Sequence, residues 1–361
     1  MKIFSQIKRI ATLEIRLSRK QKVILFLFLF FLLALGVLGY FWWVAKLKSE
    51  EKPPPESPPP QIVEEEKYPC GLAGQWISSE EKTRRLPIAV AIENHPQARP
   101  QSGLLEADLV YEALTEGGIT RFLAFYVCGE PSEIGPIRSA RSYFLDWLSE
   151  YKALYVHCGG SPESLRLLSY YGILDLDQFF NAQYFWRVSF RVSPHNLYSN
   201  SAKLRQAVSD KNYPKESNYS SFKFKDEAEL SDRPSKQEII IYYSNPQFIV
   251  RYLYNPQENT YKRFQGGFPF KDRKGKQIAP KNVVIIWTET WREDWYGRLG
   301  MKVEGQGKAL FFQDGKVIVG IWKKPSRISR TKFYNKKGEE ISFNRGQIWI
   351  QVVPLETKVS Y

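Results

Sequence analysis

Cysteine and histidine are scarce in this sequence, with three of each among 361 residues. The cysteines, Cys70, Cys128 and Cys158, lack the paired spacing of zinc ligands, which excludes a structural zinc site of the usual kind. None of them closely follows the N-terminal apolar run, so the sequence offers no cysteine for a lipid anchor there. One disulfide can form with one cysteine left over, and the sequence does not determine which pair it is.

Charged residues are absent from positions 23–45, a run of 23 residues. A helix of this length crosses a bilayer core of about 30 Å. Seven cations and one acid precede the run at residues 1–22. The positive-inside rule therefore predicts a basic cytoplasmic tail at 1–22, a transmembrane helix at 23–45 and all later residues outside the cell membrane. A cleaved signal peptide would have a shorter apolar region that ends in small residues.

The remaining chain divides into a linker and two domains. Residues 46–66 are rich in Pro and Glu, which is typical of a semi-rigid extended spacer. Residues 67–230 alternate strand-like apolar runs with helical periods at 137–151, 161–171 and 200–210, which predicts a sandwich-type α/β domain. Helical patterns disappear after Pro234, so residues 231–361 are expected to be mostly β. The predicted fold class is α+β multidomain, with two cores.

Acidic residues are few in the last domain, and residues 231–361 carry a net charge of +12. Between positions 323 and 337 there is no acid, but there are seven cations: Lys323, Lys324, Arg327, Arg330, Lys332, Lys336 and Lys337. A basic domain outside the membrane favours an anionic partner, such as a wall polymer or an acidic envelope protein. The predicted topology excludes nucleic acid, and a solvated basic surface without a partner is the alternative.

Two arginines stand at the predicted start of the helix at 137–151, in the segment GPIRSARSYF. The positive end of a helix dipole disfavours cations unless an anion joins them. We therefore expect Arg138 and Arg141 to form a clamp for a phosphate or carboxylate, with Ser139 between them. The alternative is that they form ion pairs with Glu112 or Glu116.

Two further loop motifs belong to the same domain. In HCGGSP, Ser161 suits a helix N-cap and Pro162 the first helical position. This places His157, Gly159 and Gly160 at the carboxyl end of a strand, where open α/β sheets bind ligands. The segment 185–196 adds Arg187, Arg191, His195 and Asn196. The three histidines, His95, His157 and His195, all lie in this domain near Gly, Pro or Asn, which makes acid–base chemistry conceivable.

These motifs, together with PIAVAIENHPQARPQSG, resemble in order the N-terminal domain of the bacterial YerB-like family, and TYKRFQGGFPF, NVVIIW and GQIWIQVV resemble its C-terminal domain. The resemblance covers about residues 67–361. It implies a bacterial, membrane-attached, extracytoplasmic protein of two domains without an established activity. The transmembrane helix stands where that family has a lipidated cysteine.

Polar loop residues form the candidate set for binding an anion or another ligand. The set comprises Arg121, Arg138, Ser139, Arg141, His157, Gly159, Gly160, Arg187, Arg191, His195 and Asn196, with Glu93, Glu112 and Glu116 as possible carboxylates. The leading hypothesis is a membrane-anchored cell-envelope protein that binds a phosphate- or carboxylate-bearing wall ligand. No catalytic residue and no metal ligand is assigned.

Two other functions remain open. One is a metal-assisted phosphotransferase or hydrolase acting on wall precursors linked to polyprenyl pyrophosphate, in which Glu93 or Glu116 would hold a divalent ion. The predicted architecture, one transmembrane helix followed by an arginine-bearing extracytoplasmic α/β domain, is similar to that of the LytR-CpsA-Psr phosphotransferases at the level of fold alone. The other is a scaffold for envelope proteins.

Overall fold

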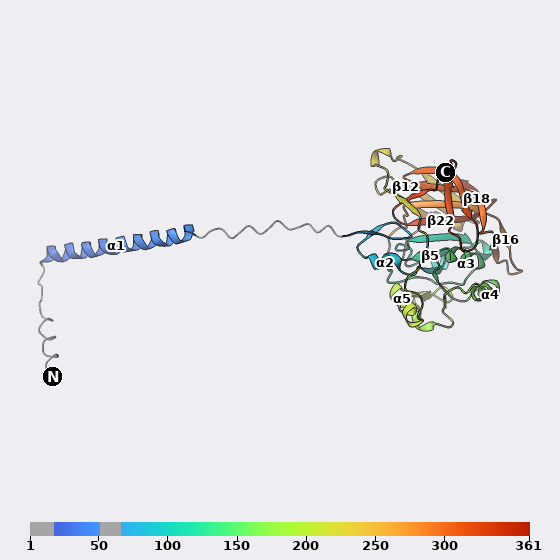
Figure 1. The fold of residues 1–361 in the computed structure, drawn as a ribbon, viewed down its shortest axis with the longest axis horizontal. Helices are drawn as coiled ribbons and strands as arrows, with labels where there is room; N and C mark the ends of the chain where they lie inside the picture. The colour runs from blue at the N-terminus through green and yellow to red at the C-terminus, as the bar shows by residue number, and fades with distance from the viewer. Residues whose placement is uncertain (1–17, 51–65) are drawn as a thin grey trace, which may run out of the picture. The chain divides into compact units, whose positions relative to one another are not determined.

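The computed structural model describes residues 18–50 and 66–361 as two separate units (Figure 1). The first is helix α1, Arg19–Glu50, which is long and apolar enough to cross a membrane. The expected span at 23–45 lies within it. Most of the predicted cytoplasmic tail and of the linker, residues 1–17 and 51–65, lies outside the described residues.

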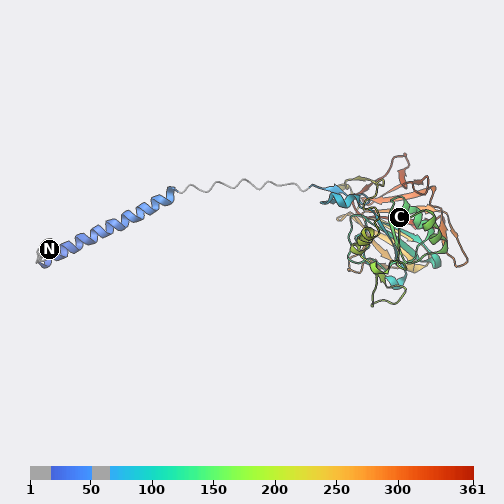
Figure 2. The ribbon, with the colours of Figure 1, turned by 60° about the horizontal axis from the view of Figure 1, so that its bottom comes forward.

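A ten-stranded sheet runs through the second unit in the order β20-β19-β18-β15-β22-β4-β5-β3-β6-β7. Five strands come from the α/β region: β3 Ile88–Glu93, β4 Leu109–Leu114, β5 Thr120–Tyr126, β6 Leu154–His157 and β7 Asp175–Asp177. Five come from the C-terminal region: β15 Asn282–Thr288, β18 Gly305–Gln313, β19 Lys316–Lys324, β20 Lys332–Asn335 and β22 Ile348–Pro354. Strand β22 pairs in parallel with both β4 and β15, so the two regions share one sheet (Figure 2).

The other elements surround this sheet. The helices are α2 Glu80–Arg84, α3 Ser142–Ser149, α4 Pro162–Tyr170 and α5 Ser201–Asp210. A five-stranded sheet has the order β14-β13-β12-β11-β23, with β11 Glu238–Tyr242, β12 Ile249–Asn255, β13 Thr260–Gln265, β14 Phe268–Pro269 and β23 Val359–Ser360. The short pairs are β1 Tyr68–Pro69 with β2 Trp76–Ile77, β8 Trp186–Arg187 with β9 Leu197–Tyr198, β10 Lys223–Lys225 with β21 Ser342–Asn344, and β16 Thr290–Arg292 with β17 Leu299–Met301. Short 3₁₀ turns complete the chain. The predicted fold class, a mixed α/β region followed by a mostly β region, is confirmed.

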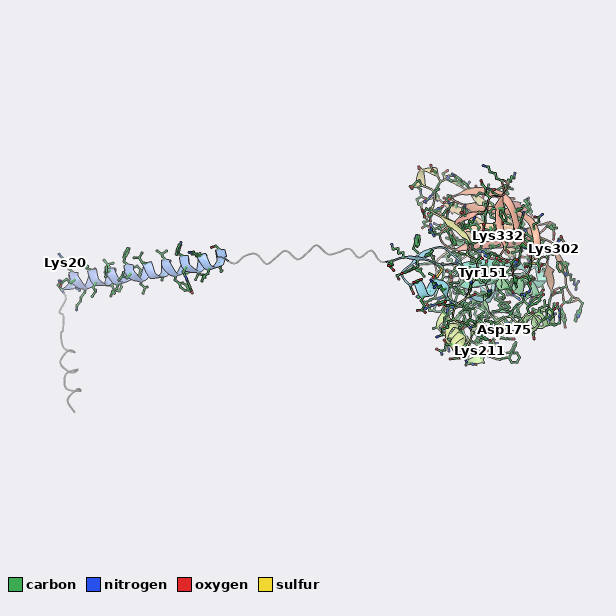
Figure 3. All side chains as sticks on the ribbon, in the orientation of Figure 1. Lys20, Tyr151, Asp175, Lys211, Lys302 and Lys332 are labelled. Carbon is green, nitrogen blue, oxygen red and sulfur yellow. A yellow bond between two sulfur atoms is a disulfide. The ribbon has the colours of Figure 1, made fainter. Side chains whose placement is uncertain are left out.

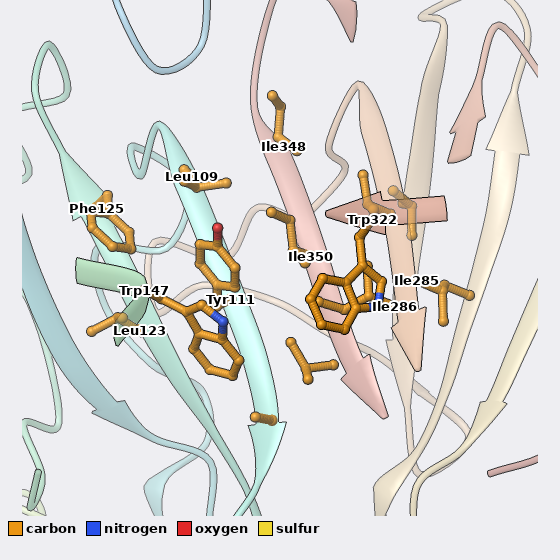
Figure 4. Close-up of a cluster of buried hydrophobic side chains, with 14 of the residues drawn as sticks. Leu109, Tyr111, Leu123, Phe125, Trp147, Ile285, Ile286, Trp322, Ile348 and Ile350 are labelled. Carbon is orange, nitrogen blue, oxygen red and sulfur yellow. The ribbon is translucent and has the colours of Figure 1, made fainter. Parts of the chain in front are cut away.

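The core forms two clusters, which lie on opposite faces of the large sheet around its central strands, whereas β15 and β18 contribute residues of both faces to the first cluster. Successive residues of a strand point to opposite faces, and accordingly Tyr111 and Ile350 belong to one cluster whereas Val110 and Trp349 belong to the other. Figure 4 shows the first cluster, in which Tyr111 stacks on Trp147 of α3 with ring centroids 4.9 Å apart. The expectation of two cores assumed one for each domain. Because the sheet is continuous, each cluster instead draws residues from both regions.

A disulfide joins Cys70 to Cys128, which resolves the pairing that the sequence left open. Cys158 is the free cysteine of the described chain. The bond ties the segment after β1 to the end of β5 across 58 positions.

The helix expected at 137–151 begins later, at Ser142. The backbone of Arg138 is instead extended alongside β3, where its N–H donates to the Ala91 carbonyl. The Ala140 N–H likewise donates to the Gly159 carbonyl. Since these hydrogen bonds run to the sheet, residues 137–141 cannot form a helical turn, and Arg138 and Arg141 do not lie in one. The helices expected at 161–171 and 200–210 are observed as α4 and α5.

Candidate functional site

Most candidate residues lie along one edge of the large sheet. Strands β3, β4, β6, β7, β15 and β22 share one direction, because β3 and β4 are both antiparallel to β5 and the remaining pairings among the six are parallel. Their carboxyl ends therefore meet along one edge, which is where open α/β sheets bind ligands. Glu93 ends β3, His157 ends β6 and Asp177 ends β7.

At this edge, the side chains of Arg141 and Arg121 are buried and interact with other groups of the protein. The Arg141 Nε donates to Glu116 Oε2 at 3.0 Å, its Nη2 pairs with Glu116 Oε1, and only 5% of the side chain is exposed. Arg121 donates to the Ser139 carbonyl at 2.8 Å, and its Nη2 lies 3.8 Å from Glu116. For Arg141, the ion-pairing alternative is therefore observed, with Glu116 as the partner.

The charges of this group shift the pKa of its members. Burial raises the pKa of the Glu116 carboxyl, but the positive charges of Arg121 and Arg141 outweigh this effect and leave that pKa below its usual value. Burial, followed by the charge of Arg141, lowers the pKa of Arg121 to about 10. The Glu116 carboxylate thus balances part of the positive charge of Arg121 and Arg141.

Glu112 is not part of this group and forms a fully buried ion pair with Arg263 of β13. The distance from Oε2 to the Arg263 Nη1 is 2.9 Å, and Thr120 donates to Oε1 at 2.7 Å. Glu112 therefore connects the two regions of the chain. Nothing in the sequence around Arg263 marks it as the partner of a residue 151 positions away.

A second group at the edge surrounds the carboxylate of Glu93, which is 4% exposed. The Arg138 Nε lies 3.2 Å from one oxygen, and the His195 Nδ1 lies 2.8 Å from the other. The His95 ring stacks on the His195 ring at 4.8 Å. Burial lowers the pKa of His95, and the neighbouring His195 acts in the same direction. The Arg138 side chain remains 29% exposed.

Arg187 joins this group from strand β8. Its exposed side chain is oriented by Asn196, whose Oδ1 accepts a hydrogen bond from Nη1 at 2.8 Å. Burial and the charge of Asp177 raise the pKa of the Cys158 thiol, while Arg187 and Arg138 act in the opposite direction. The Cys158 N–H donates to the Arg138 carbonyl at 3.1 Å, and Arg187 lies on the same β8–β9 hairpin as His195. We call Glu93, His95, Arg138, Arg187, His195 and Asn196 the edge cluster.

The glycine turn after β6 is held by its own hydrogen bonds. The ring of His157 is fully buried and contacts the Gly159 carbonyl at 2.8 Å and the Asp175 carboxylate at 3.2 Å. At Gly160, a Cβ would lie 2.5 Å from the Ser164 Oγ, so the glycine is required for packing. Ser161 caps α4 as expected, accepting a hydrogen bond from the Ser164 N–H.

Arg191 connects the β8–β9 hairpin to the loop that follows β3. Its guanidinium donates to the carbonyls of Gln97 and Pro100 at 2.5 and 2.6 Å. These bonds use both terminal nitrogens of the guanidinium, so Arg191 supports the hairpin between β8 and β9 that carries His195.

Comparisons with known proteins agree with this fold. The family model described as "Protein of unknown function (DUF3048) N-terminal domain" matches residues 72–214, and that of the corresponding C-terminal domain matches residues 239–350. The chain belongs to the DUF3048 family. It is 36% identical over 287 residues to "Putative lipoprotein YerB" of Bacillus subtilis (strain 168), covering 77% of this chain and 84% of that protein. The crystal structure of YerB from Bacillus subtilis is similar with a TM-score of 0.74 at 33% identity, covering 82% of this chain and all of the other.

The structure of this DUF3048 protein does not favour a divalent metal ion at either expected carboxylate. Glu93 faces Arg138, and Glu116 faces two arginines, so cations already occupy the positions where an ion would need to bind. In residues 18–50 and 66–361, the one cluster of three metal-ligating side chains is Cys70, Asp108 and Cys128, and its two sulfurs form the disulfide.

Of the predicted set, the structure brings together Glu93, Arg138, Arg187, His195 and Asn196. It places Arg121, Ser139, Arg141 and Glu116 in the neighbouring group, His157, Gly159 and Gly160 in the turn, and Arg191 and Glu112 in separate supporting contacts. His95 was missing from the set. Its position two residues after the end of β3 was the available signal.

Proposed function

We propose that this DUF3048 protein is anchored in the bacterial cell membrane and binds a phosphate- or carboxylate-bearing envelope ligand at the edge cluster. The proposed topology has the N-terminus in the cytoplasm and residues 66–361 outside. It is supported by α1, by the seven cations before the apolar run, and by the disulfide, a bond typical of oxidising compartments outside the cytoplasm. The similarity to a protein named as a lipoprotein agrees with membrane attachment.

The observation that carries the proposal is the exposure of Arg138 and Arg187. Within residues 66–361, Glu93 is the one side chain that forms an ion pair with Arg138, through Nε, and Arg187 hydrogen-bonds Asn196 through Nη1 alone. Both side chains retain donors that face water, and two positive charges stand against the single negative charge of Glu93. Guanidinium donors of this kind bind phosphate and carboxylate oxygens well.

Calorimetry with inorganic pyrophosphate at low salt tests the proposal on residues 66–361. This unit contains both core clusters and the disulfide. We expect Arg138→Gln and Arg187→Gln each to weaken binding about tenfold, the loss of one charged hydrogen-bonding group. Arg84→Gln is the matched control, because Arg84 is an exposed arginine of α2 paired with a single glutamate. Equal binding by all four proteins would refute the site.

Substitution of Glu93 separates anion binding from the metal-assisted alternative. Glu93→Gln removes a negative charge beside the proposed anion, so it should tighten pyrophosphate binding several-fold without added metal. A metal-assisted phosphotransferase would lose activity with the same change, because the carboxylate would be its ligand. The enzyme would be favoured if Glu93→Gln bound pyrophosphate more weakly than the wild type, and if a divalent ion strengthened binding by the wild type but not by the variant.

We further propose that the basic C-terminal region contacts an anionic wall polymer through fewer cations than the sequence indicates. Lys324 and Arg330 form ion pairs with the buried carboxylate of Glu150, in which Nζ and Nη1 lie 3.2 and 2.8 Å from its oxygens. Lys323 and Lys332 stay exposed and lie directly opposite each other on β19 and β20. Like charges in that position repel, and an anionic polymer would relieve this repulsion.

Binding to purified wall polymer at several salt concentrations tests this contact. Lys323→Gln with Lys332→Gln should lower affinity and reduce its dependence on salt. Lys211→Gln is the control, since Lys211 is an exposed lysine of the α/β region (Figure 3). An unchanged salt dependence in the double variant would exclude this pair as the contact.

A further inference from the structure

Two adjacent phenylalanines are exposed at the same edge of the sheet. Phe179 and Phe180, which follow β7, are 68% and 85% exposed. The turn that presents them is well defined, because the Asp177 carboxylate accepts hydrogen bonds from the N–H groups of Phe179 and Gly159 at 3.1 and 2.9 Å. Neighbouring large apolar side chains held in water in this way are typical of binding surfaces.

The phenylalanine pair lies beside the edge cluster. The Phe179 ring packs against Gly159, since a Cβ added to Gly159 would lie 3.0 Å from the ring. The N–H of the preceding residue, Cys158, donates to the Arg138 carbonyl at 3.1 Å. Its sulfur also contacts Gln178, the residue before Phe179, at 3.4 Å. Cationic donors and an apolar surface are therefore neighbours around one turn.

We propose that the edge cluster and the Phe179–Phe180 pair together bind an amphipathic phosphate, a molecule with a phosphate group on an apolar chain. The phosphate lies against Arg138 and Arg187, and the apolar chain lies against the phenylalanine rings. This inference rests on the proposed function and narrows its ligand to a lipid phosphate. Inorganic phosphate has no part that would cover the two rings.

The apolar helix α1 agrees with such a ligand. If α1 spans the membrane, it attaches the protein to a bilayer, and the phosphates of lipids are among the anions available there.

The first experiment compares inorganic pyrophosphate with geranyl pyrophosphate, which has the same charged group and a ten-carbon chain. Calorimetry on residues 66–361 should show at least tenfold tighter binding of geranyl pyrophosphate, because the chain removes apolar surface from water. The variant Phe179→Ser with Phe180→Ser should lose this advantage and keep its affinity for pyrophosphate. Arg138→Gln should weaken both ligands.

Leu230→Ser is the matched control for the phenylalanine variant. Leu230 is 55% exposed and lies at the opposite edge of the sheet, in the segment whose Ala228 N–H donates to Asp314 after β18. It should bind both ligands like the wild type. Equal affinity of the wild type for the two ligands, or an advantage that survives the phenylalanine changes, would overturn the inference and leave the proposed function intact. Failure of both ligands to bind would overturn both.

Vesicle flotation identifies the source of the lipid phosphate. Vesicles of phosphatidylcholine with and without phosphatidic acid are mixed with the same four proteins. Flotation that requires phosphatidic acid, Arg138 and the two phenylalanines would identify a bilayer lipid as the ligand. Binding of geranyl pyrophosphate without flotation would instead identify a lipid phosphate taken up one molecule at a time.

Discussion

The buried ion pair between Glu112 and Arg263 offers the most decisive test of how the two regions are joined. Both side chains are fully buried, and they come from strands β4 and β13 in different halves of the chain. Glu112→Gln keeps the shape of the side chain and removes its charge. The Arg263 guanidinium would then lie in the core with the neutral partners Tyr252 and Gln265, at 2.8 and 2.9 Å.

The expected cost follows from the loss of charge compensation. Removing one member of a buried ion pair costs about 3–5 kcal/mol, because the other charge is left in a medium of low polarity. Arg263 cannot reach water, since aromatic rings surround it, with those of Phe270 and Trp349 both centred 4.7 Å from its guanidinium carbon. We therefore expect Glu112→Gln to lower the free energy of unfolding by about 4 kcal/mol.

Urea denaturation of residues 66–361 measures this change. The control is Glu80→Gln, which breaks the exposed pair with Arg84 and should cost at most about 1 kcal/mol. A double variant, Glu112→Leu with Arg263→Met, replaces the pair by apolar groups and should recover most of the stability. A loss below about 1 kcal/mol in Glu112→Gln, or a double variant no more stable than the single one, would refute the reasoning.

Three other predictions concern stability. Burial raises the pKa of Asp146 to about 6, so the native state binds more protons than the unfolded state between about pH 4 and pH 6. Stability should fall as pH rises through that window, and Asp146→Asn should remove the dependence in urea denaturation; an unchanged profile would contradict it. Loss of the Cys70–Cys128 bond in Cys128→Ser should cost about 4 kcal/mol in thermal unfolding, given its separation of 58 residues; a loss that adding reductant to the wild type does not reproduce would point to packing instead. Arg141→Gln should cost about 1–3 kcal/mol by freeing Glu116, with pyrophosphate affinity unchanged in calorimetry; weakened binding would return Arg141 to the ligand site.

Local patterns predicted much of the secondary structure. Continuous apolar runs correctly indicated the buried strands β3 and β22, since strands covered on both faces need no polar alternation. The N-cap at Ser161 correctly indicated the start of α4. The start of α3 was predicted wrongly, because the helical spacing of apolar residues around Ile137 arises from an extended segment that pairs with β3.

The candidate site was only partly predictable, because its organisation depends on contacts between distant residues. Loop positions correctly indicated that Arg138, Arg141 and His195 lie in loops, and they placed all three in one candidate set. They could not indicate that Arg141 would form a buried ion pair with Glu116, whereas Arg138 would pair with Glu93 and stay partly exposed. The single sheet was also beyond the sequence patterns, since the parallel pairing of β22 with β4 joins segments more than 200 positions apart.

The depth of each arginine explains which ones remain available to a ligand. A guanidinium removed from water must be paired, because an unpaired buried charge is too costly. Arg121 and Arg141 accordingly have Glu116. Arg138 and Arg187 lie nearer to water and need one partner each, which orients them and leaves other donors unfilled. A ligand that replaces water there gains hydrogen bonds without breaking any that the fold requires, and the fixed orientation reduces the entropy lost on binding.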